Sequence, residues 1–198
     1  MNVTAAAAAF TAIPTLVEVW KRRVDVRPEL PRKLVHTGSG LLAAALPYFL
    51  SYREIIGLTA GFVLVMAVSR GAHVFTAVHS AERDSYGELF FPLGVGVLAT
   101  MHPQHWVFAY AVLVLALADT AAAAVGMRFP FGRYPFGGKS LTGTLAFTLV
   151  AFAVGIPFAP VAACALAAVA AACVEAVAPR GLDNLAVPVV AALLIGVT

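Results

Sequence analysis

Charged residues are scarce in this chain, and long hydrophobic runs take their place. Only 12% of the 198 residues are Asp, Glu, Lys or Arg, whereas 61% are hydrophobic. The mean hydropathy is +0.90, and soluble domains typically carry about 25% charged residues. The composition therefore excludes an ordinary soluble fold and predicts an integral membrane protein.

Cysteine and excess charge are scarce as well. The two cysteines, Cys164 and Cys173, lie in one Ala-rich apolar run, so we expect small apolar side chains rather than a disulfide framework. The net charge of +3 is weak, and the basic residues are not gathered on one exposed face, which excludes nucleic acid as a partner. No polar linker divides the chain, so residues 1–198 are expected to form one membrane domain.

Apolar runs predict the fold, an all-α polytopic membrane helix bundle with about eight transmembrane segments. The runs are Val3–Trp20, Thr37–Leu50, Ile55–Ser69, Leu89–Met101, Trp106–Met127, Leu141–Phe158, Val161–Ala178 and Leu185–Thr198. Several are shorter than the roughly 20 residues that a straight helix needs to cross the hydrocarbon layer. Some of these segments are therefore expected to extend into their flanks or to be broken, and Pro92 and Pro188 mark two expected breaks.

The basic residues predict the orientation of the chain. Of 13 Lys and Arg residues, 12 fall in the first, third, fifth and seventh connections, and only Arg53 lies elsewhere. Short cytoplasmic loops carry the Lys and Arg excess, so the N-terminus is expected outside. The basic cluster follows the first apolar run, which argues against a cleaved signal peptide. We expect a multi-pass protein of the plasma (inner) membrane, with its functional loops in the cytoplasm.

Ionisable side chains within membrane spans are costly, so those that occur are candidates for function. The first two clusters of such residues open the second and the fourth span. Lys33 and His36 share one helical face, and Gly38 and Gly40 beside them allow a helix or a phosphate to approach closely, so this cluster is either a positive anchor or a site. Glu88 either caps the start of a helix or takes part in chemistry.

Between these two clusters, residues 72–84 mix apolar side chains with charges and histidines. This composition is typical of a helix that lies in the headgroup layer. His73 and His79 are six residues apart, which is weak evidence for a metal site.

The third cluster is typical of a phosphate-binding loop. The segment 137–144 combines glycines, one lysine and hydroxyl side chains. Backbone N–H groups exposed at Gly138 and Gly143, together with a helix that begins near Ser140, supply the donors that a polyphosphate needs. The segment is not a P-loop, because Arg133 stands where that motif has glycine and no strand precedes it.

Asp119 lies at the cytoplasmic end of the fifth span, close to this loop in the sequence. A carboxylate in apolar surroundings needs a cation, and a Mg²⁺ ion that also binds phosphate oxygens satisfies it. A plain salt bridge from Asp119 to Lys139 or Arg128 is the alternative.

The fourth cluster closes the seventh span and opens the eighth, with Glu175, Asp183 and Asn184. Asp and Asn are also ordinary helix caps, so a capped turn is the alternative. All four clusters fall on the side that the basic residues place in the cytoplasm, and the far side offers no converging charges. An active site is therefore expected at the cytoplasmic side.

The order of these motifs resembles a known family. After Lys33 and His36 come Gly-Glu-Leu-Phe-Phe at 87–91, Ala-Asp-Thr-Ala-Ala-Ala-Ala-Val-Gly at 118–126, Lys-Ser-Leu-Thr-Gly-Thr-Leu-Ala at 139–146 and Asp-Asn-Leu at 183–185. Over about residues 30–190 the set is similar to the CTP-dependent lipid kinases, namely phytol kinase, dolichol kinase and the yeast-type diacylglycerol kinase. These are related to CTP:phosphatidate cytidylyltransferases. One departure is Thr142, where the family pattern has an acidic residue.

The resemblance implies Mg²⁺-dependent phosphoryl transfer from CTP to the hydroxyl of a lipid alcohol. The alcohol is an isoprenoid such as phytol, geranylgeraniol, polyprenol or dolichol, or it is diacylglycerol. The protein would position the reactants and neutralise phosphoryl charge. We expect Asp119 to hold Mg²⁺, and Glu88 and Asp183 to hold a second metal or to activate the lipid hydroxyl. The residues expected to bind the nucleotide phosphates are Lys33, Gly138, Lys139, Ser140, Thr142, Gly143 and Asn184, with His36 completing the clamp.

Two other functions remain open. A cytidylyltransferase would use the same groups to join a lipid phosphate to the α-phosphate of CTP, with release of pyrophosphate. A small-solute transporter would use the buried carboxylates and Lys139 as an ion pathway, although the polar clusters lie on one side. The expected partners are the nucleotide, the lipid alcohol and membrane lipids. Small residues in Val161–Ala178 also allow close helix contact, either within one chain or in a homodimer.

Overall fold

A computed structural model describes residues 1–27, 29–72, 74–75, 85–135 and 138–196. The predicted interfacial helix over 72–84, with His73 and His79, lies almost entirely outside the described residues, as does Gly137. The described chain is all-helical apart from one isolated β-bridge, which confirms the predicted fold class. Its elements are α1 (Val3–Lys21), α2 (Glu29–Ala45), the 3₁₀ turn η1 (Leu46–Tyr48), α3 (Tyr52–Gly71), α4 (Gly87–Thr100), α5 (His105–Leu113), the π-helical turn η2 (Val114–Ala118), α6 (Asp119–Arg128), α7 (Leu141–Gly155), α8 (Val161–Val177) and α9 (Asp183–Ile195).

The helical segments match the predicted spans one for one. Because α5, η2 and α6 continue as a single apolar helix of 24 residues, the described chain makes eight helical rods. Three of them, α1, α3 and the α5–α6 rod, are long and apolar enough to cross a membrane. The helices α4, α7, α8 and α9 are shorter but also apolar. Length and composition together describe a membrane helix bundle.

Three of the described helices are too short to cross the hydrocarbon layer as straight helices. α4, α7 and α9 have 14, 15 and 13 residues, so each is about 20 Å long, against about 30 Å of hydrocarbon. The predicted extension into a flank occurs in α2, which begins at Glu29 instead of Thr37. α4 and α9 begin two residues before their predicted runs, at Gly87 and Asp183, and α7 begins at the predicted Leu141. These three helices therefore remain shorter than a straight span.

The prediction of helix breaks at Pro92 and Pro188 is wrong, because α4 continues through Pro92 and α9 continues through Pro188. A proline removes only the hydrogen bond to the carbonyl four residues earlier, which for Pro188 is that of Asn184. This carbonyl oxygen lies against Gly94 of α4, where an added Cβ atom would be 2.3 Å from it. Close packing of the two helix backbones accommodates the missing bond.

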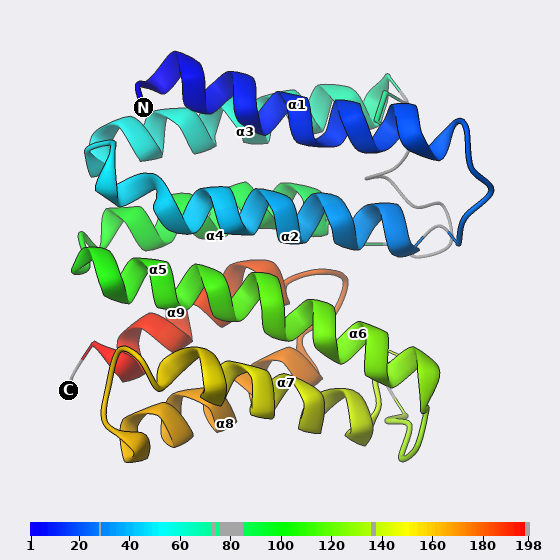
Figure 1. Cartoon of the computed structure of the whole chain (residues 1–198), viewed down its shortest axis with the longest axis vertical. Coiled ribbons are helices and arrows are strands. Elements are labelled where there is room, and N and C mark those ends of the chain that lie inside the picture. The colour runs from blue at the N-terminus through cyan, green and yellow to red at the C-terminus, as the bar shows by residue number, and fades with distance from the viewer. Residues whose placement is uncertain (28, 73, 76–84, 136–137, 197–198) are drawn as a thin grey trace.

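The helices pack in two layers. The front layer in Figure 1 contains α1, α2, the α5–α6 rod and α7, and the layer behind it contains α3, α4, α9 and α8. Successive rods run in opposite directions, so the starts of α2, α4, α7 and α9 meet the ends of α1, α3, α6 and α8 at one end, on the right in Figure 1. We call it the basic end, because its connections carry Lys21, Arg22, Arg23, Arg27, Arg133, Lys139 and Arg180. Which compartment it faces stays a prediction.

Small residues let the layers approach closely. An added Cβ atom on Gly40 of α2 would lie 2.3 Å from the Cβ of Ala116 in η2. α8 turns a face of small residues inward, where Ala163, Cys164, Ala167, Ala168, Ala171 and Ala172 are buried. The close contact that these residues allow is thus made within one chain, and the homodimer gains no support from it. Both cysteines are free, Cys164 buried and Cys173 exposed, as the sequence predicts for apolar side chains without a disulfide.

Replacing Gly94 by alanine is expected to lower the free energy of unfolding by about 1–3 kcal/mol, because the new methyl group has no room against the Asn184 carbonyl. The matched control is Gly57→Ala in α3, where nothing lies within 4 Å of an added Cβ. This variant should gain up to about 1 kcal/mol from the higher helix propensity of alanine. Thermal unfolding in detergent measures both variants. Equal unfolding temperatures would contradict the close packing of α4 on α9.

Candidate active site

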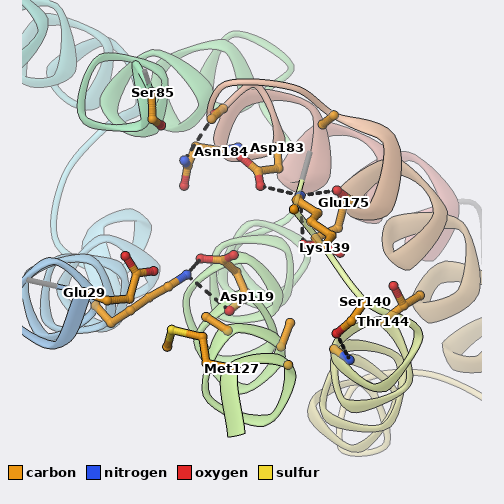
Figure 2. A pocket seen from close by; sticks show the side chains of 18 of the residues that line it. Glu29, Ser85, Asp119, Met127, Lys139, Ser140, Thr144, Glu175, Asp183 and Asn184 are labelled. Atoms are coloured by element: carbon orange, nitrogen blue, oxygen red, sulfur yellow. Dashed lines mark hydrogen bonds and ion pairs between the residues drawn. The ribbon is translucent and has the colours of Figure 1, made fainter. Parts of the chain in front are cut away.

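A cavity of about 530 Å³ opens at the basic end of the bundle. Figure 2 shows side chains from α2, α6, α7, α8 and α9 directed into it. Its lining includes five basic and four acidic side chains, which are Arg32, Lys33, Arg133, Lys139 and Arg180, and Glu29, Asp119, Glu175 and Asp183. Of the other predicted site residues, Gly138, Ser140, Gly143 and Asn184 also line it. The structure therefore brings most of the predicted site together.

Helix starts surround this cavity. Glu29 and Lys33 come from the first turns of α2, Gly143 from that of α7, and Asp183 from that of α9. Ser85, just before α4, also lines the cavity. The first turn of a helix carries unpaired N–H groups and a partial positive charge. An anionic ligand such as a phosphate is therefore favoured in this cavity.

The first charged centre of the cavity joins α2 to α6. The Lys33 ammonium forms an ion pair with the Asp119 carboxylate and also donates to the Asp119 backbone carbonyl at 3.2 Å. Both side chains are largely buried. The predicted salt bridge of Asp119 with Lys139 or Arg128 is thus wrong in its partner. Asp119 follows directly on the π-helical turn η2, a feature that often marks functional sites in helices.

His36 lies next to this ion pair, one turn further along α2. Its Nε2 is 3.4 Å from Asp119 Oδ2 and 3.2 Å from the carbonyl oxygen of Leu115. A carbonyl only accepts hydrogen bonds, so Nε2 carries the proton in this arrangement. The ring also meets Phe91 edge to face, with centroids 5.3 Å apart. His36 does not line the cavity; it holds the Asp119 carboxylate from behind.

The second charged centre is formed by Lys139, Glu175 and Asp183. The Lys139 ammonium is 2.8 Å from Glu175 Oε1 and 2.9 Å from Asp183 Oδ2, and it also donates to the Glu175 backbone carbonyl. Burial lowers the pKa of Lys139, but the two carboxylates raise it by more, so its pKa lies above the ordinary value. The ammonium therefore stays charged through neutral and moderately alkaline pH.

The two centres meet at their carboxylates. Ligand oxygens of Asp119, Glu175 and Asp183 all lie within 4.8 Å of one another; Figure 2 labels the three residues around the same pocket. Oxygen donors of this kind suit Mg²⁺, which usually takes one or two carboxylates together with phosphate oxygens. The donor set present therefore fits the predicted metal. The sequence prediction named Asp119 and Asp183 but gave Glu175 no role.

The segment before α7 is a short hairpin. Tyr134 N–H donates to the Lys139 carbonyl at 2.9 Å, and Leu141 N–H donates to the Gly132 carbonyl at 3.0 Å. Ser140 caps α7, and its hydroxyl accepts from Gly143 N–H at 3.2 Å. The helix start predicted near Ser140 is confirmed. Thr142 donates to the Phe129 carbonyl, and its hydroxyl lies 3.1 Å from that of Ser140; it does not itself line the cavity.

Asn184 connects α9 to the loops around it. Its side-chain amide donates to the Gly181 carbonyl at 3.2 Å, and its backbone N–H donates to Asp183 Oδ1 at 3.1 Å. An added Cβ atom on Gly87 would lie 2.8 Å from the Asn184 amide nitrogen. The residue thus fixes the start of α9 against the start of α4.

Glu88 stands apart from the other predicted site residues. It is buried in α4, is paired with Arg70 of α3, and does not line the cavity. Arg70 also donates to the Ser85 carbonyl at 2.8 Å and lies over the Tyr86 ring at 4.5 Å. Glu88 is thereby part of a support beneath the loop that enters α4, and the structure does not bring it to Asp119 or Asp183.

Several residues that line the cavity were not among the predicted site residues. They are Glu29, Arg32, Ser85, Glu175, Arg133 and Arg180. Arg32, Arg133 and Arg180 were counted only as basic loop residues that set the orientation. Their proximity to the motifs in the sequence, one residue before Lys33 or three before Asp183, was the signal that could have identified them.

The fold and the cavity define a membrane helix bundle whose basic end holds a charged cavity with three clustered carboxylates. The chain is 32% identical to the phytol kinase of Synechocystis sp. (strain ATCC 27184 / PCC 6803 / Kazusa) over 205 aligned positions, which cover 95% of this chain and 88% of that protein. No family profile matches the chain, and no solved structure matches it significantly.

The chain belongs to the family of membrane lipid kinases that includes phytol kinase. It is accordingly an enzyme, a phosphotransferase that acts on a lipid alcohol. This membership agrees with the order of the motifs in residues 30–190. It favours an enzyme over the small-solute transporter as the explanation of the buried charges.

Proposed function

We propose that this enzyme transfers the γ-phosphoryl group of CTP to the hydroxyl of an isoprenoid alcohol of the phytol or geranylgeraniol type, in the presence of Mg²⁺. The observation that supports it most is the meeting of Asp119, Glu175 and Asp183 with two lysines beside the start of α7. The name of the Synechocystis relative supports the isoprenoid alcohol.

In the proposed reaction the alcohol oxygen attacks the γ-phosphorus of CTP. The bond between the γ-phosphorus and the bridging oxygen breaks, CDP leaves, and the hydroxyl proton passes to a carboxylate of the cavity. The residues of this chain act mainly by holding the reactants in line and by neutralising phosphoryl charge. Lys33 and Lys139 supply that charge, and the N–H groups at the start of α7 supply hydrogen bonds.

Asp119, Glu175 and Asp183 would hold the Mg²⁺ ion. When bound, the ion would neutralise charge on the phosphate oxygens. His36 orients the Asp119 carboxylate from the α2 side. Lys33 and Lys139 pair with these carboxylates and hold the cluster together. When the nucleotide is bound, their ammonium groups would also neutralise part of the phosphate charge.

The short helices give a reason for building such an enzyme within a bilayer. α4, α7 and α9 are about 10 Å shorter than the hydrocarbon layer is thick, and the charged cavity lies at the starts of α7 and α9, with Ser85 before α4 at its edge. A lipid hydroxyl can then meet the phosphates while its chain stays among the lipids. With the basic end in the cytoplasm of the inner membrane, the site would have access to soluble CTP.

The test is a transfer assay with purified protein in detergent, γ-labelled CTP and Mg²⁺. The alcohols are phytol, geranylgeraniol, a long polyprenol and diacylglycerol. Label in phytol or geranylgeraniol, with CDP as the second product, is the expected result. Release of pyrophosphate with formation of a CDP-lipid would identify the cytidylyltransferase instead. Label only from ATP would overturn the choice of nucleotide.

A further inference from the structure

Two arginines of the cavity have no role in the reaction described so far. Arg133 belongs to the hairpin before α7, and Arg180 belongs to the loop between α8 and α9. Both line the cavity, and both are exposed rather than enclosed in the bundle. They reach the same space from two segments that are far apart in the sequence.

Three cations of the cavity form ion pairs with its carboxylates. Lys33 faces Asp119, and Lys139 faces both Glu175 and Asp183. Arg32 is held by Glu29 within the first turn of α2. A nucleoside triphosphate brings three to four negative charges, so it requires positive charge beyond these pairs, even after one Mg²⁺ ion has bound.

Arg133 meets this requirement by its position. Within the residues that the structure describes, no carboxylate pairs with its guanidinium. Its backbone is fixed by the β-bridge to Ser140, the cap of α7. The side chain is therefore anchored beside the helix start that is best placed for a phosphate.

Arg180 is held in an unusual backbone conformation. Its φ angle is +50°, in the left-handed region that a residue with a Cβ atom adopts only at a cost. The conformation is kept by the bond from Tyr86 N–H to the Arg180 carbonyl, 2.9 Å long. Gly181 beside it, with φ +88°, packs so tightly on Gly87 that an added Cβ atom would lie 2.5 Å from the Gly87 nitrogen. Glycine would fit position 180 without strain, yet the chain has an arginine there, among the residues that line the cavity.

We propose that Arg133 and Arg180 form a guanidinium clamp on the phosphates of the nucleotide, in addition to Lys33 and Lys139. The inference rests on the proposed function, since it assigns further contacts to the same nucleotide. Guanidinium groups suit this task because they bind phosphate oxygens through two parallel N–H donors. The support from Arg70 and Glu88 beneath Ser85 and Tyr86 keeps the Arg180 loop in place.

The test is the affinity of purified protein in detergent for CTP, ATP and pyrophosphate, measured by calorimetry. Arg133→Ala and Arg180→Ala are each expected to weaken CTP binding about 10- to 100-fold, the loss typical of a charge-assisted contact. Arg180→Lys, which keeps the charge but not the fork of donors, should fall between Arg180→Ala and the parent. Arg53→Ala, at the opposite end of the bundle, is the matched control and should bind CTP as the parent does.

Arg180→Gly separates binding from folding. Glycine adopts the left-handed conformation freely, so this variant removes the guanidinium and relieves the backbone strain at position 180, and it should lose the same affinity as Arg180→Ala. A lower unfolding temperature with unchanged CTP affinity would assign Arg180 a structural role and overturn its part in the clamp. Unchanged affinity in Arg133→Ala would overturn the part of Arg133.

The outcomes distinguish this inference from the proposed function. If the parent binds CTP and the arginine variants do not, but no lipid becomes labelled, the clamp stands and the kinase reaction fails. If lipid is labelled and all variants bind CTP equally, the reaction stands and the clamp fails. A parent that binds neither CTP, ATP nor pyrophosphate would overturn both.

Discussion

Asp119→Asn is expected to reduce the transfer of labelled phosphate to the lipid alcohol at least about 100- to 1000-fold, the scale of losing one charge-stabilising group in an active site. Asparagine is nearly isosteric but uncharged, so it removes both the carboxylate that we propose holds Mg²⁺ and the partner of the buried Lys33 ammonium. The assay is the one with γ-labelled CTP and the preferred alcohol.

The single variant also loses stability, because a buried ammonium is left without its carboxylate. Breaking such a pair typically costs about 3–5 kcal/mol, whereas replacing both partners by apolar side chains is often neutral. The control is therefore Lys33→Met combined with Asp119→Asn. This double variant should unfold near the temperature of the parent yet remain inactive. Activity within about threefold of the parent in the double variant would exclude Asp119 from the reaction.

Lys139→Met is expected to produce the second large effect, a loss of about 100- to 1000-fold in kcat/KM for CTP. The substitution removes the ammonium that lies 2.8 Å from Glu175 and 2.9 Å from Asp183, and it leaves two acidic side chains facing each other. Their repulsion lowers the unfolding temperature as well. Kinetics with varied CTP, together with thermal unfolding in detergent, measure the two effects.

Lys139→Arg is the matched control, since it keeps the positive charge for both carboxylates. It should unfold like the parent and still lose activity, because a planar guanidinium does not replace a compact ammonium. The pKa of Lys139 is raised, so its contribution to stability is fully present below the ordinary lysine value of about 10.4 and is lost only as pH rises beyond it. No loss of stability from Lys139 is therefore expected between about pH 6 and 9. A Lys139→Met enzyme with the kcat/KM of the parent would contradict its role.

The segment 137–144 shows what a local sequence pattern can predict. Glycines, a hydroxyl cap and a lysine within 137–144 predicted a helix start near Ser140, and the structure has α7 begin at Leu141 with Ser140 as its cap. A cap depends on residues within three positions, so the sequence contains all that is needed. Thr142 has the same composition signal, but its hydroxyl is taken up by the Phe129 carbonyl, a contact that only the folded hairpin creates.

The partners of the charges could not be predicted in this way. Asp119 pairs with Lys33, 86 positions earlier, and Lys139 pairs with Asp183, 44 positions later. Glu88 belongs to Arg70 instead of the cavity. Each pairing depends on which rods are neighbours in the two layers, and hydropathy is the same for many arrangements of eight apolar helices.

Composition and the order of apolar runs thus determined by themselves that the chain is an all-α membrane bundle, because a backbone in lipid must satisfy its own hydrogen bonds and a helix does so locally. The same order placed all four charged clusters at one side of the membrane, because each lies at the start of an even-numbered span or at the end of an odd-numbered one. Tertiary structure alone decided that Asp119, Glu175 and Asp183 share one cavity. The physical reason is that helix formation depends on adjacent residues, whereas the pairing of buried charges depends on packing between helices that are distant in the chain.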